Sequence, residues 1–492
     1  MRKLHIEIRL ENSTPKNDEN DENLINKIKQ IMPQFIFNPH TFLPSDEQNN
    51  KIGRNILRIF IECLDKSRGS RIDLTTERLE AANYYFYTAN NYGEMAEEVA
   101  EKENNEGDSQ VGTFQWELPS IEFEGFWENL IYEIDDCPKS KLTNFISTSL
   151  KFARFGIDPK ILSRNHLILL NVYDQKSFDV FRNSILSSIG FCIEFQLAHY
   201  ILKFIFYILC PPGTGKTTLC KAVAQRMALQ TQQIFNQTLF VEVNSHSLFS
   251  KWFSESGKLI QKLFSKIEEL AERTDRLIFV LIDEVESLTI GRETAFSGND
   301  PTDSIRAVNA MLTQLDRLKR FSNVFIICTS NIERALDAAF VDRIGLSLYF
   351  KSPTLEVINS ILTNCVDEMK RVKGLFANNG GQPDWWTENL ENEIFKKISS
   401  NCQKAKLSGR ALRKLPTIAY SIAAQNLDEN DYGSEGSSNI TFPEFIYCLY
   451  IESEKLINKE IEEEDKNFKE ENKTWSFNFD KLRDCLTQQN GF

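Results

Sequence analysis

Residues 211–218 have the types and spacing of a loop that binds phosphate groups. Three parts carry the chemistry: a Pro/Gly turn whose backbone N–H groups face phosphate oxygens, a lysine that reaches the β- and γ-phosphates, and hydroxyls that can ligate Mg²⁺. The segment consists of Pro211, Pro212, Gly213, Thr214, Gly215, Lys216, Thr217 and Thr218. The usual pattern opens with a glycine five residues before Gly215, with four residues between them, at the position that Cys210 occupies here. The segment predicts a site for ATP and Mg²⁺, with Thr217 on the metal.

A pair of carboxylates follows a continuous apolar run further along the chain. LIFVLIDEVESL, from Leu277 to Leu288, predicts a buried strand that ends at Asp283 and Glu284. Asp283 is expected to hold Mg²⁺ through water, and Glu284 to act as general base on the attacking water. By itself, such a pattern also fits a strand that merely ends in acidic residues. The phosphate-binding segment upstream favours the catalytic interpretation.

Three further polar residues are candidates for the same reaction. Asn331 ends the apolar run NVFIICTSN and is placed to orient the attacking water. Arg343 ends RALDAAFVDR, and an arginine there can stabilise the transferring phosphoryl group at a neighbouring subunit's site. Arg410 opens a helix in LSGRALRKLP and can contact the γ-phosphate. For both arginines, a surface salt bridge is the alternative.

Trp252 and Phe253 lie in NSHSLFSKWFSESGK, a stretch that is otherwise rich in Ser, Lys and Glu. Aromatic residues in such a loop are costly unless they touch something. Lys251, Trp252 and Phe253 are therefore expected to form a pore loop that grips a polypeptide. A local core contact is the alternative interpretation.

The elements between these motifs predict an α/β fold. HLILL, LFVEV, LIFVLID and NVFIICTS are apolar throughout, as in strands buried on both faces, and helical patterns separate them. This alternation predicts a parallel sheet followed by a helical lid, with a small α+β domain before it. The predicted parts are an N-terminal domain over 1–89, an acidic linker over 90–113, a large subdomain over 114–353, a lid over 354–457 and a charged tail over 458–492.

Composition narrows the function classes. The 492 residues carry a net charge of −13, which argues against direct binding to nucleic acid or an anionic membrane. The 10 cysteines form no framework and the N-terminus shows no secretory signal, so a reducing compartment is expected. The apolar run 185–209 is interrupted by charged residues, and we expect no membrane span.

The order of these motifs resembles that of an AAA+ ATPase, and their amino-acid sequences resemble those of the pachytene checkpoint ATPase family in particular. The resemblance covers about 115–458 and rests on QWELPSIEFEGFWENLIYE, NSHSLFSKWFSESGKL, VLIDEVESL, SIRAVNAMLTQLDRLKR, TSNIERALDAAFVDR and LSGRALRKLP. It implies Walker roles for Lys216, Thr217, Asp283 and Glu284, sensor roles for Asn331 and Arg410, a trans-acting finger at Arg343, and a second pore loop over 289–303.

The resemblance also implies a function. Through this family, the chain is similar to homohexameric ATPases that convert HORMA-domain proteins from the closed to the open form. Their partners are the spindle-checkpoint and meiotic-axis HORMA proteins and a comet-type adaptor, and the N-terminal domain receives the substrate. The resemblance implies roles in checkpoint silencing, synaptonemal-complex assembly and meiotic recombination. It therefore implies a location in the nucleus and on chromosomes, and also in the cytoplasm. Two alternatives stay open: a scaffold that binds these partners without hydrolysis, and a different AAA+ machine.

One segment departs from the family pattern. HLILL would normally run directly into the phosphate-binding loop, but residues 172–209 intervene, where such connections usually have about two to six residues. FIFYIL, just before Cys210, then competes with HLILL for one place in the sheet. If the loop needs glycine at position 210, a side chain there costs about 1–3 kcal/mol. We interpret 172–209 as a retained intron or, alternatively, a genuine isoform; native tryptic peptides from 177–182 would contradict the first.

Overall fold

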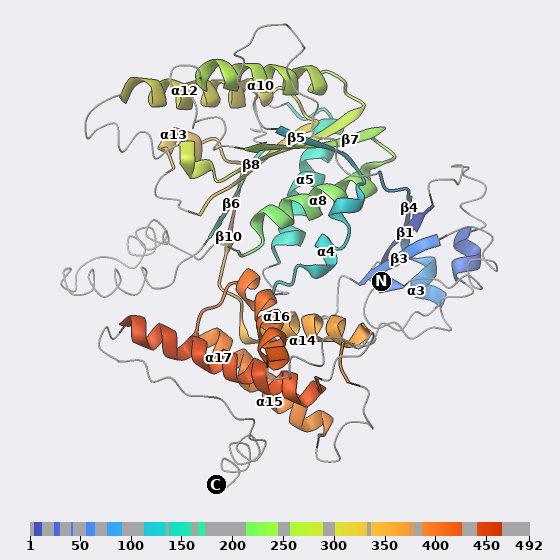
Figure 1. Ribbon diagram of the computed structural model, residues 1–492. Helices are drawn as coiled ribbons and strands as arrows, with labels where there is room; N and C mark the ends of the chain where they lie inside the picture. Colours follow the sequence, from blue (N-terminus) through green and yellow to red (C-terminus); the bar gives the residue numbers. More distant parts are fainter. Residues whose placement is uncertain are drawn as a thin grey trace, which may run out of the picture. The chain divides into compact units, whose positions relative to one another are not determined.

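The computed structural model describes residues 4–11, 24–29, 41–42, 56–63, 76–90, 113–133, 137–158, 166–172, 213–244, 256–288, 301–331, 336–372, 375–377, 386–425 and 440–464 (Figure 1). It divides into two compact units. The first comprises Met1–Pro211 with Gly215–Lys351, and the second Pro212–Thr214 with Ser352–Phe492. The domain boundaries taken from the sequence stay predictions.

A six-stranded sheet in the order β10-β6-β9-β8-β7-β5 forms the centre of the first unit. Its strands are β5 (Thr113–Leu118), β6 (Leu167–Val172), β7 (Gln237–Asn244), β8 (Arg276–Asp283), β9 (Val324–Thr329) and β10 (Leu346–Phe350). Neighbours pair in parallel from β10 to β7, and β5 pairs antiparallel with β7. The predicted α/β class is confirmed: the central strands β8 and β9 are buried almost along their whole length, as expected for parallel strands that helices cover on both faces.

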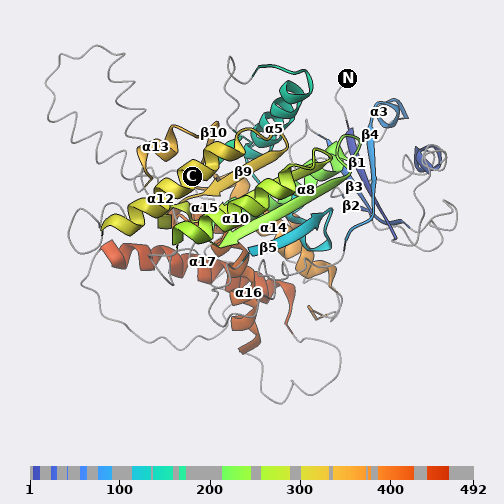
Figure 2. The ribbon, with the colours of Figure 1, turned by 90° about the horizontal axis from the view of Figure 1, so that it is seen from above.

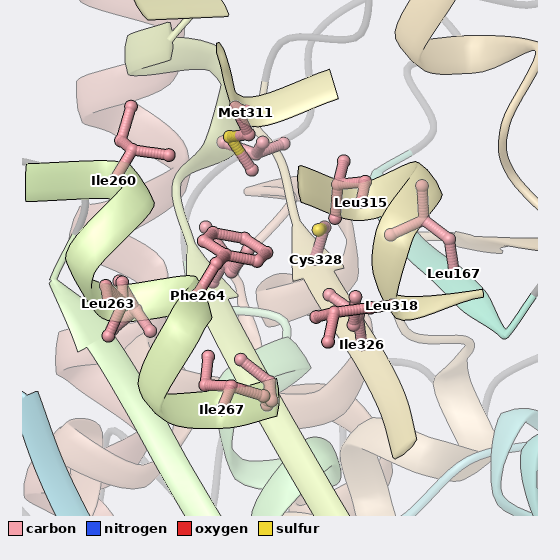
Figure 3. Packing of buried hydrophobic residues seen from close by; sticks show 14 of the residues in the cluster. Leu167, Ile260, Leu263, Phe264, Ile267, Met311, Leu315, Leu318, Ile326 and Cys328 are labelled. Atoms are coloured by element: carbon pink, nitrogen blue, oxygen red, sulfur yellow. The ribbon is translucent and has the colours of Figure 1, made fainter. Parts of the chain in front are cut away.

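Helices α10 (Ser256–Ala271) and α12 (Pro301–Leu318) cover one face and lie side by side in both views (Figures 1 and 2). α5 (Pro138–Arg154) and α8 (Lys216–Thr231) cover the other face. Figure 3 shows the first of these layers, where the packed residues include Ile260, Leu263, Phe264, Ile267, Met311, Leu315, Leu318, Ile326 and Cys328. Burying each large apolar side chain contributes about 1.5–3 kcal/mol, so the sheet edge that carries the polar residues rests on a rigid base. Short helices α4 (Phe126–Asn129) and α13 (Ala338–Val341) and 3-10 turns η2 (Ile121–Phe123) and η3 (Val285–Leu288) complete this part.

HLILL and FIFYIL are the two candidates for one strand of the sheet, and the structure describes only HLILL. HLILL forms β6, and it pairs with β10 through Leu346 and Ile168 and with β9 through Leu167 and Ile326. β6 therefore fills the place in the sheet between β10 and β9. FIFYIL, Cys210 and the rest of 173–212 lie outside the described residues.

The N-terminal segment forms a separate four-stranded sheet in the order β2-β3-β1-β4. Its elements are β1 (Leu4–Leu10), β2 (Thr41–Phe42), β3 (Ile56–Cys63), α3 (Thr76–Glu80) and β4 (Asn83–Tyr87). β1 runs antiparallel to β3 and parallel to β4. The alternation in LHIEIRL places Leu4, Ile6, Ile8 and Leu10 in one buried cluster, each at most 5% exposed.

An arginine on α8 joins this small sheet to the larger part of the same unit. Arg226 is 3% exposed and forms ion pairs with Glu7 of β1 and, at 2.5 Å, with Glu62 of β3. Its guanidinium carbon lies 5.3 Å from the centre of the Trp127 ring, and the Trp127 indole N–H donates to Glu62 at 2.9 Å. Near this cluster, Arg9 pairs with Glu124 and Arg58 pairs with Glu128. We call Arg226, Glu7, Glu62 and Trp127 the Arg226 cluster.

Arg226→Met is expected to destabilise this junction by about 3–5 kcal/mol, because it leaves two carboxylates of the small sheet without their buried cation. Amide hydrogen exchange of peptides from β1 and β3 should become faster. Adding Glu62→Gln to Arg226→Met should recover part of the loss. Arg320→Met removes an arginine whose side chain is 61% exposed and serves as the control. Unchanged exchange in Arg226→Met would show that the junction does not depend on the Arg226 cluster.

The second unit is helical where it is described. Its helices are α14 (Leu355–Arg371), α15 (Glu388–Lys404), α16 (Gly409–Gln425) and α17 (Phe442–Glu464). Phe376 packs edge-on against Tyr420 of α16 and Phe442 of α17, and it also contacts Phe445. This agrees with the helical pattern that the sequence shows beyond 354. None of the helices in the described ranges has both the length and the apolarity needed to cross a membrane.

Candidate active site

The phosphate-binding loop leads into the first turn of α8. Gly215 caps this helix with φ 87°, a left-handed conformation that favours glycine, and a Cβ there would lie 2.9 Å from Leu130 Cδ2. The Gly215 carbonyl accepts the first helical bond from the Leu219 N–H at 2.8 Å. Lys216, Thr217 and Thr218 therefore form the first helical turn, where unpaired N–H groups and the helix dipole favour an anion.

Lys216 reaches from this turn to the end of β9. It is 7% exposed, and its Nζ donates to Asn331 Oδ1 at 2.6 Å. Two residues predicted for the same site, 115 positions apart, are thus in direct contact. The pairing places the phosphate-binding amine beside the amide that is expected to orient water.

Thr217 and Asp283 bring together the two predicted magnesium ligands. The Thr217 hydroxyl lies 3.2 Å from Asp283 Oδ1 and 3.1 Å from Oδ2. Hydroxyl and carboxylate oxygens suit Mg²⁺, which in nucleotide sites takes most of its other ligands from phosphates and water. No group of three or more His, Cys, Asp or Glu side chains in the described ranges could hold a metal by itself. The residues present therefore fit a magnesium ion that is bound together with a nucleotide.

Glu284 follows β8 in an unusual backbone conformation. Its φ is 54°, which is uncommon for a residue with a side chain. Such a conformation costs about 1–3 kcal/mol and persists where neighbouring groups hold it. The Glu284 N–H donates to the Thr329 hydroxyl at 3.1 Å, and the same hydroxyl donates to Asp283 Oδ1.

Two residues of this arrangement were missed by the sequence analysis, namely Thr329 and Glu286. Thr329 ends β9 and is 1% exposed. Glu286 is 7% exposed, and its Oε1 accepts from the Asn331 N–H at 3.0 Å. Both lie inside motifs that the sequence had singled out, within two residues of a predicted site residue. The hydroxyl at the end of an otherwise apolar strand was the available signal for Thr329.

Within the described part of the chain, Arg343 does not contact the site formed by Lys216, Thr217, Asp283 and Asn331. Its Nε donates to Asp316 Oδ1 at 3.0 Å and one terminal nitrogen donates to Oδ2 at 2.7 Å, while the other donates to the Ala339 carbonyl at 2.6 Å. The hydrogen bonds from Arg343 are the main reason why the pKa of Asp316 lies below its usual value. The surface salt bridge named as an alternative is therefore present, and the role of Arg343 at a neighbouring subunit stays a prediction.

Arg410 is the second residue of α16, which begins at Gly409 in the second unit. Its backbone N–H donates to the Gly213 carbonyl at 3.1 Å. Gly213 has φ 99°, and a Cβ there would lie 2.7 Å from the Arg410 Cβ, so this approach requires glycine at position 213. The backbone of Arg410 thus lies against the glycine turn of the phosphate-binding loop. The predicted contact of its side chain with a γ-phosphate stays a prediction.

Several predicted site residues lie outside the described residues. They are Pro211 and Pro212 of the phosphate-binding loop, Lys251, Trp252 and Phe253 of the first pore loop, and positions 289–300 of the second. Their roles stay predictions.

Comparisons with known proteins agree with the arrangement described above. Residues 206–352 match the ATPase family associated with various cellular activities (AAA). The chain is 38% identical over 350 residues to the pachytene checkpoint protein 2 homolog of Oryza sativa subsp. indica, a match that covers 67% of this chain and 65% of the relative. It is 31% identical over 474 residues to the homolog of Homo sapiens, covering 94% of each chain. Among solved structures, PCH-2 of C. elegans matches with a TM-score of 0.63 and 28% identity, covering 94% of this chain and all of that one.

Proposed function

Because this chain belongs to the pachytene checkpoint protein 2 family of AAA ATPases, we propose that it couples ATP hydrolysis to the remodelling of HORMA-domain proteins from the closed to the open form. The observation that carries the ATPase part is the convergence of Lys216, Thr217, Asp283 and Asn331 at one edge of the sheet. These are the groups that an enzyme needs to bind a triphosphate and to direct water at it.

The residues divide the hydrolytic work among them. The Lys216 ammonium and the N-terminal N–H groups of α8 bind the phosphates and offset their charge. Mg²⁺, which Thr217 and Asp283 would hold, supplies further charge neutralisation when it is bound. Glu284 accepts a proton from water as the water oxygen bonds to the γ-phosphorus, and Asn331 orients that water. The bond from the γ-phosphorus to the β–γ bridging oxygen breaks, which yields ADP and inorganic phosphate.

The finer parts of the proposal rest on the resemblance of the sequence motifs to the family. We propose a homohexamer that acts on spindle-checkpoint and meiotic-axis HORMA proteins, with a comet-type adaptor and with the N-terminal domain as the receiving part. The pore loop with Lys251, Trp252 and Phe253 would pull on the substrate, and Arg343 would act on the neighbouring site. We propose that the protein acts on chromosomes in the nucleus, and also in the cytoplasm, in checkpoint silencing and meiotic recombination.

Trp252→Ala is expected to abolish ATP-dependent conversion of a purified HORMA protein while basal ATP hydrolysis stays near the wild-type rate. The reason is that Trp252 belongs to the proposed grip on the polypeptide and not to the phosphate-binding residues. Conversion is followed by separating the open and closed forms on an ion-exchange column. Phe155→Ala removes an aromatic side chain that is 79% exposed at the end of α5 and is the matched control. Conversion at the wild-type rate in Trp252→Ala would refute the pore-loop assignment.

One observation favours a second candidate function. Cys210 stands where the phosphate-binding pattern has its first glycine, and a side chain at that position can impair nucleotide handling. The second candidate is a scaffold that binds HORMA partners without turnover. A wild-type protein that binds ATP but releases no phosphate would favour the scaffold.

A further inference from the structure

The ends of β8 and β9 hold each other through two hydrogen bonds that run in opposite directions. From β9, the Thr329 hydroxyl accepts from the backbone N–H of Glu284 at 3.1 Å. From the turn after β8, the Glu286 carboxylate accepts from the backbone N–H of Asn331 at 3.0 Å. Each side chain therefore fixes the backbone of a residue that is expected to act on the attacking water. We call this pair of bonds the reciprocal staple.

The chemistry of the Thr329 hydroxyl suits this position. A hydroxyl carries one hydrogen and two lone pairs, so it can accept from Glu284 and donate to Asp283 Oδ1 at the same time. Asp283 is also the partner of Thr217. One buried oxygen atom thus connects the backbone of the general base to the magnesium-binding carboxylate.

The left-handed backbone conformation of Glu284 needs a stabilising contact, which the reciprocal staple supplies. Its φ of 54° is unfavourable for a residue with a side chain, and a residue in that conformation turns back to common values unless the surroundings hold it. Thr329 bonds the N–H of this same residue, and it does so from a strand that is fixed on both sides by β6 and β8. Loss of the bond would free the segment that aims the Glu284 carboxylate.

We propose that Thr329 and Glu286 are positioning residues, which align Glu284 and Asn331 for the attack of water on ATP. The inference rests on the proposed hydrolytic function of this site. Neither residue is required to touch the reacting atoms: Thr329 acts through Glu284 and Asp283, and Glu286 acts through Asn331.

Thr329→Val is the direct test, because valine has nearly the same shape and lacks the hydroxyl. We expect kcat for ATP hydrolysis to fall about 10- to 100-fold, as for a catalytic group that is displaced by about an ångström. The KM for ATP should change by less than about twofold, because the phosphate-binding groups stay in place. Thr329→Ser keeps the hydroxyl and should recover most of the rate. A wild-type kcat in Thr329→Val, or a loss in Thr329→Ser as large as in Thr329→Val, would overturn the proposal.

Glu286 is tested by the same comparison of paired variants. Glu286→Gln keeps an oxygen that can accept from Asn331, whereas Glu286→Ala removes it. The alanine variant should lower kcat with little change in KM, and the glutamine variant should be the milder of the two. A parallel loss of kcat, nucleotide affinity and melting temperature in Glu286→Ala would indicate a structural role alone and would overturn this half of the proposal.

Amide hydrogen exchange of peptides that cover 283–286 separates failure of the staple from failure of the ATPase assignment. Exchange does not depend on turnover, and it should be faster in Thr329→Val than in wild type and in Thr329→Ser. If the wild type releases no phosphate, hydrolysis by this chain is refuted, and faster exchange still supports the staple. Exchange at the wild-type rate in Thr329→Val overturns the staple whatever the turnover.

Discussion

Glu284→Gln is expected to bind ATP as tightly as the wild type and to hydrolyse it at least about a hundredfold more slowly. The amide has nearly the shape of the carboxylate but cannot accept the proton of the attacking water. The groups that are proposed to bind the phosphates, Lys216 and the first turn of α8, are unchanged. Phosphate release gives kcat, and titration with a fluorescent ATP analogue gives the affinity.

The control for this experiment is Glu368→Gln, which removes the charge of an exposed carboxylate on α14 that pairs with Arg371. It should leave both quantities at their wild-type values. Hydrolysis by Glu284→Gln at the wild-type rate would mean that another group is the base. A wild type as slow as the variant would instead favour the scaffold, with Cys210 as the residue to change to glycine next.

Arg343→Ala is expected to lower kcat by about a thousandfold or more if Arg343 acts as a finger on the neighbouring site. In the single chain, Arg343 donates two hydrogen bonds to Asp316 and a third to the Ala339 carbonyl, all of them exposed. Asp316 is 42% exposed, and an ion pair of this kind contributes only about 0–1 kcal/mol. Release of the guanidinium to a neighbour is therefore inexpensive. Arg320→Ala, at an arginine that is 61% exposed, is the control.

A mixing experiment shows whether Arg343 acts on its own site or on a neighbour's. Arg343→Ala retains Glu284, and Glu284→Gln retains Arg343. In equal, randomly assorted mixtures, about one quarter of the subunit contacts would combine an intact Glu284 with an intact Arg343 from the neighbour. We therefore expect about a quarter of the wild-type rate from two proteins that are each inactive. A mixture as inactive as its components would refute action on the neighbour.

The convergence of Lys216, Asp283 and Asn331 was predictable from the sequence. Continuous apolar runs identify parallel strands, the carboxyl ends of parallel strands meet at one edge of a sheet, and each run ends in a polar residue. The antiparallel pairing of β5 with β7 was not predicted, because an edge strand is added by long-range contacts that leave no periodic signal.

The contacts that hold the site residues in place could not be predicted from the sequence either. Thr329 is a small polar residue in a motif, and nothing in its type reveals that its hydroxyl meets the backbone of Glu284. Arg226 lies on a helix for which the spacing of Leu219, Val223 and Met227 predicts only an apolar docking face. Its partner Glu62 is 164 positions away, and the pairing of two charged residues so far apart is decided by the fold.

The length of α8 has a mechanical consequence. The helix is continuous from Lys216 to Thr231, and the ten helical steps from Lys216 to Arg226, at about 1.5 Å each, span about 15 Å. Lys216, the proposed phosphate-binding lysine, lies at one end of this stretch, and Arg226 at the other end is anchored by buried ion pairs in the N-terminal sheet. Such a helix transmits displacement without absorbing it. If Lys216 binds a triphosphate as proposed, a tilt at that end of the helix would move the N-terminal sheet, and a load on the sheet would act on the phosphate-binding turn.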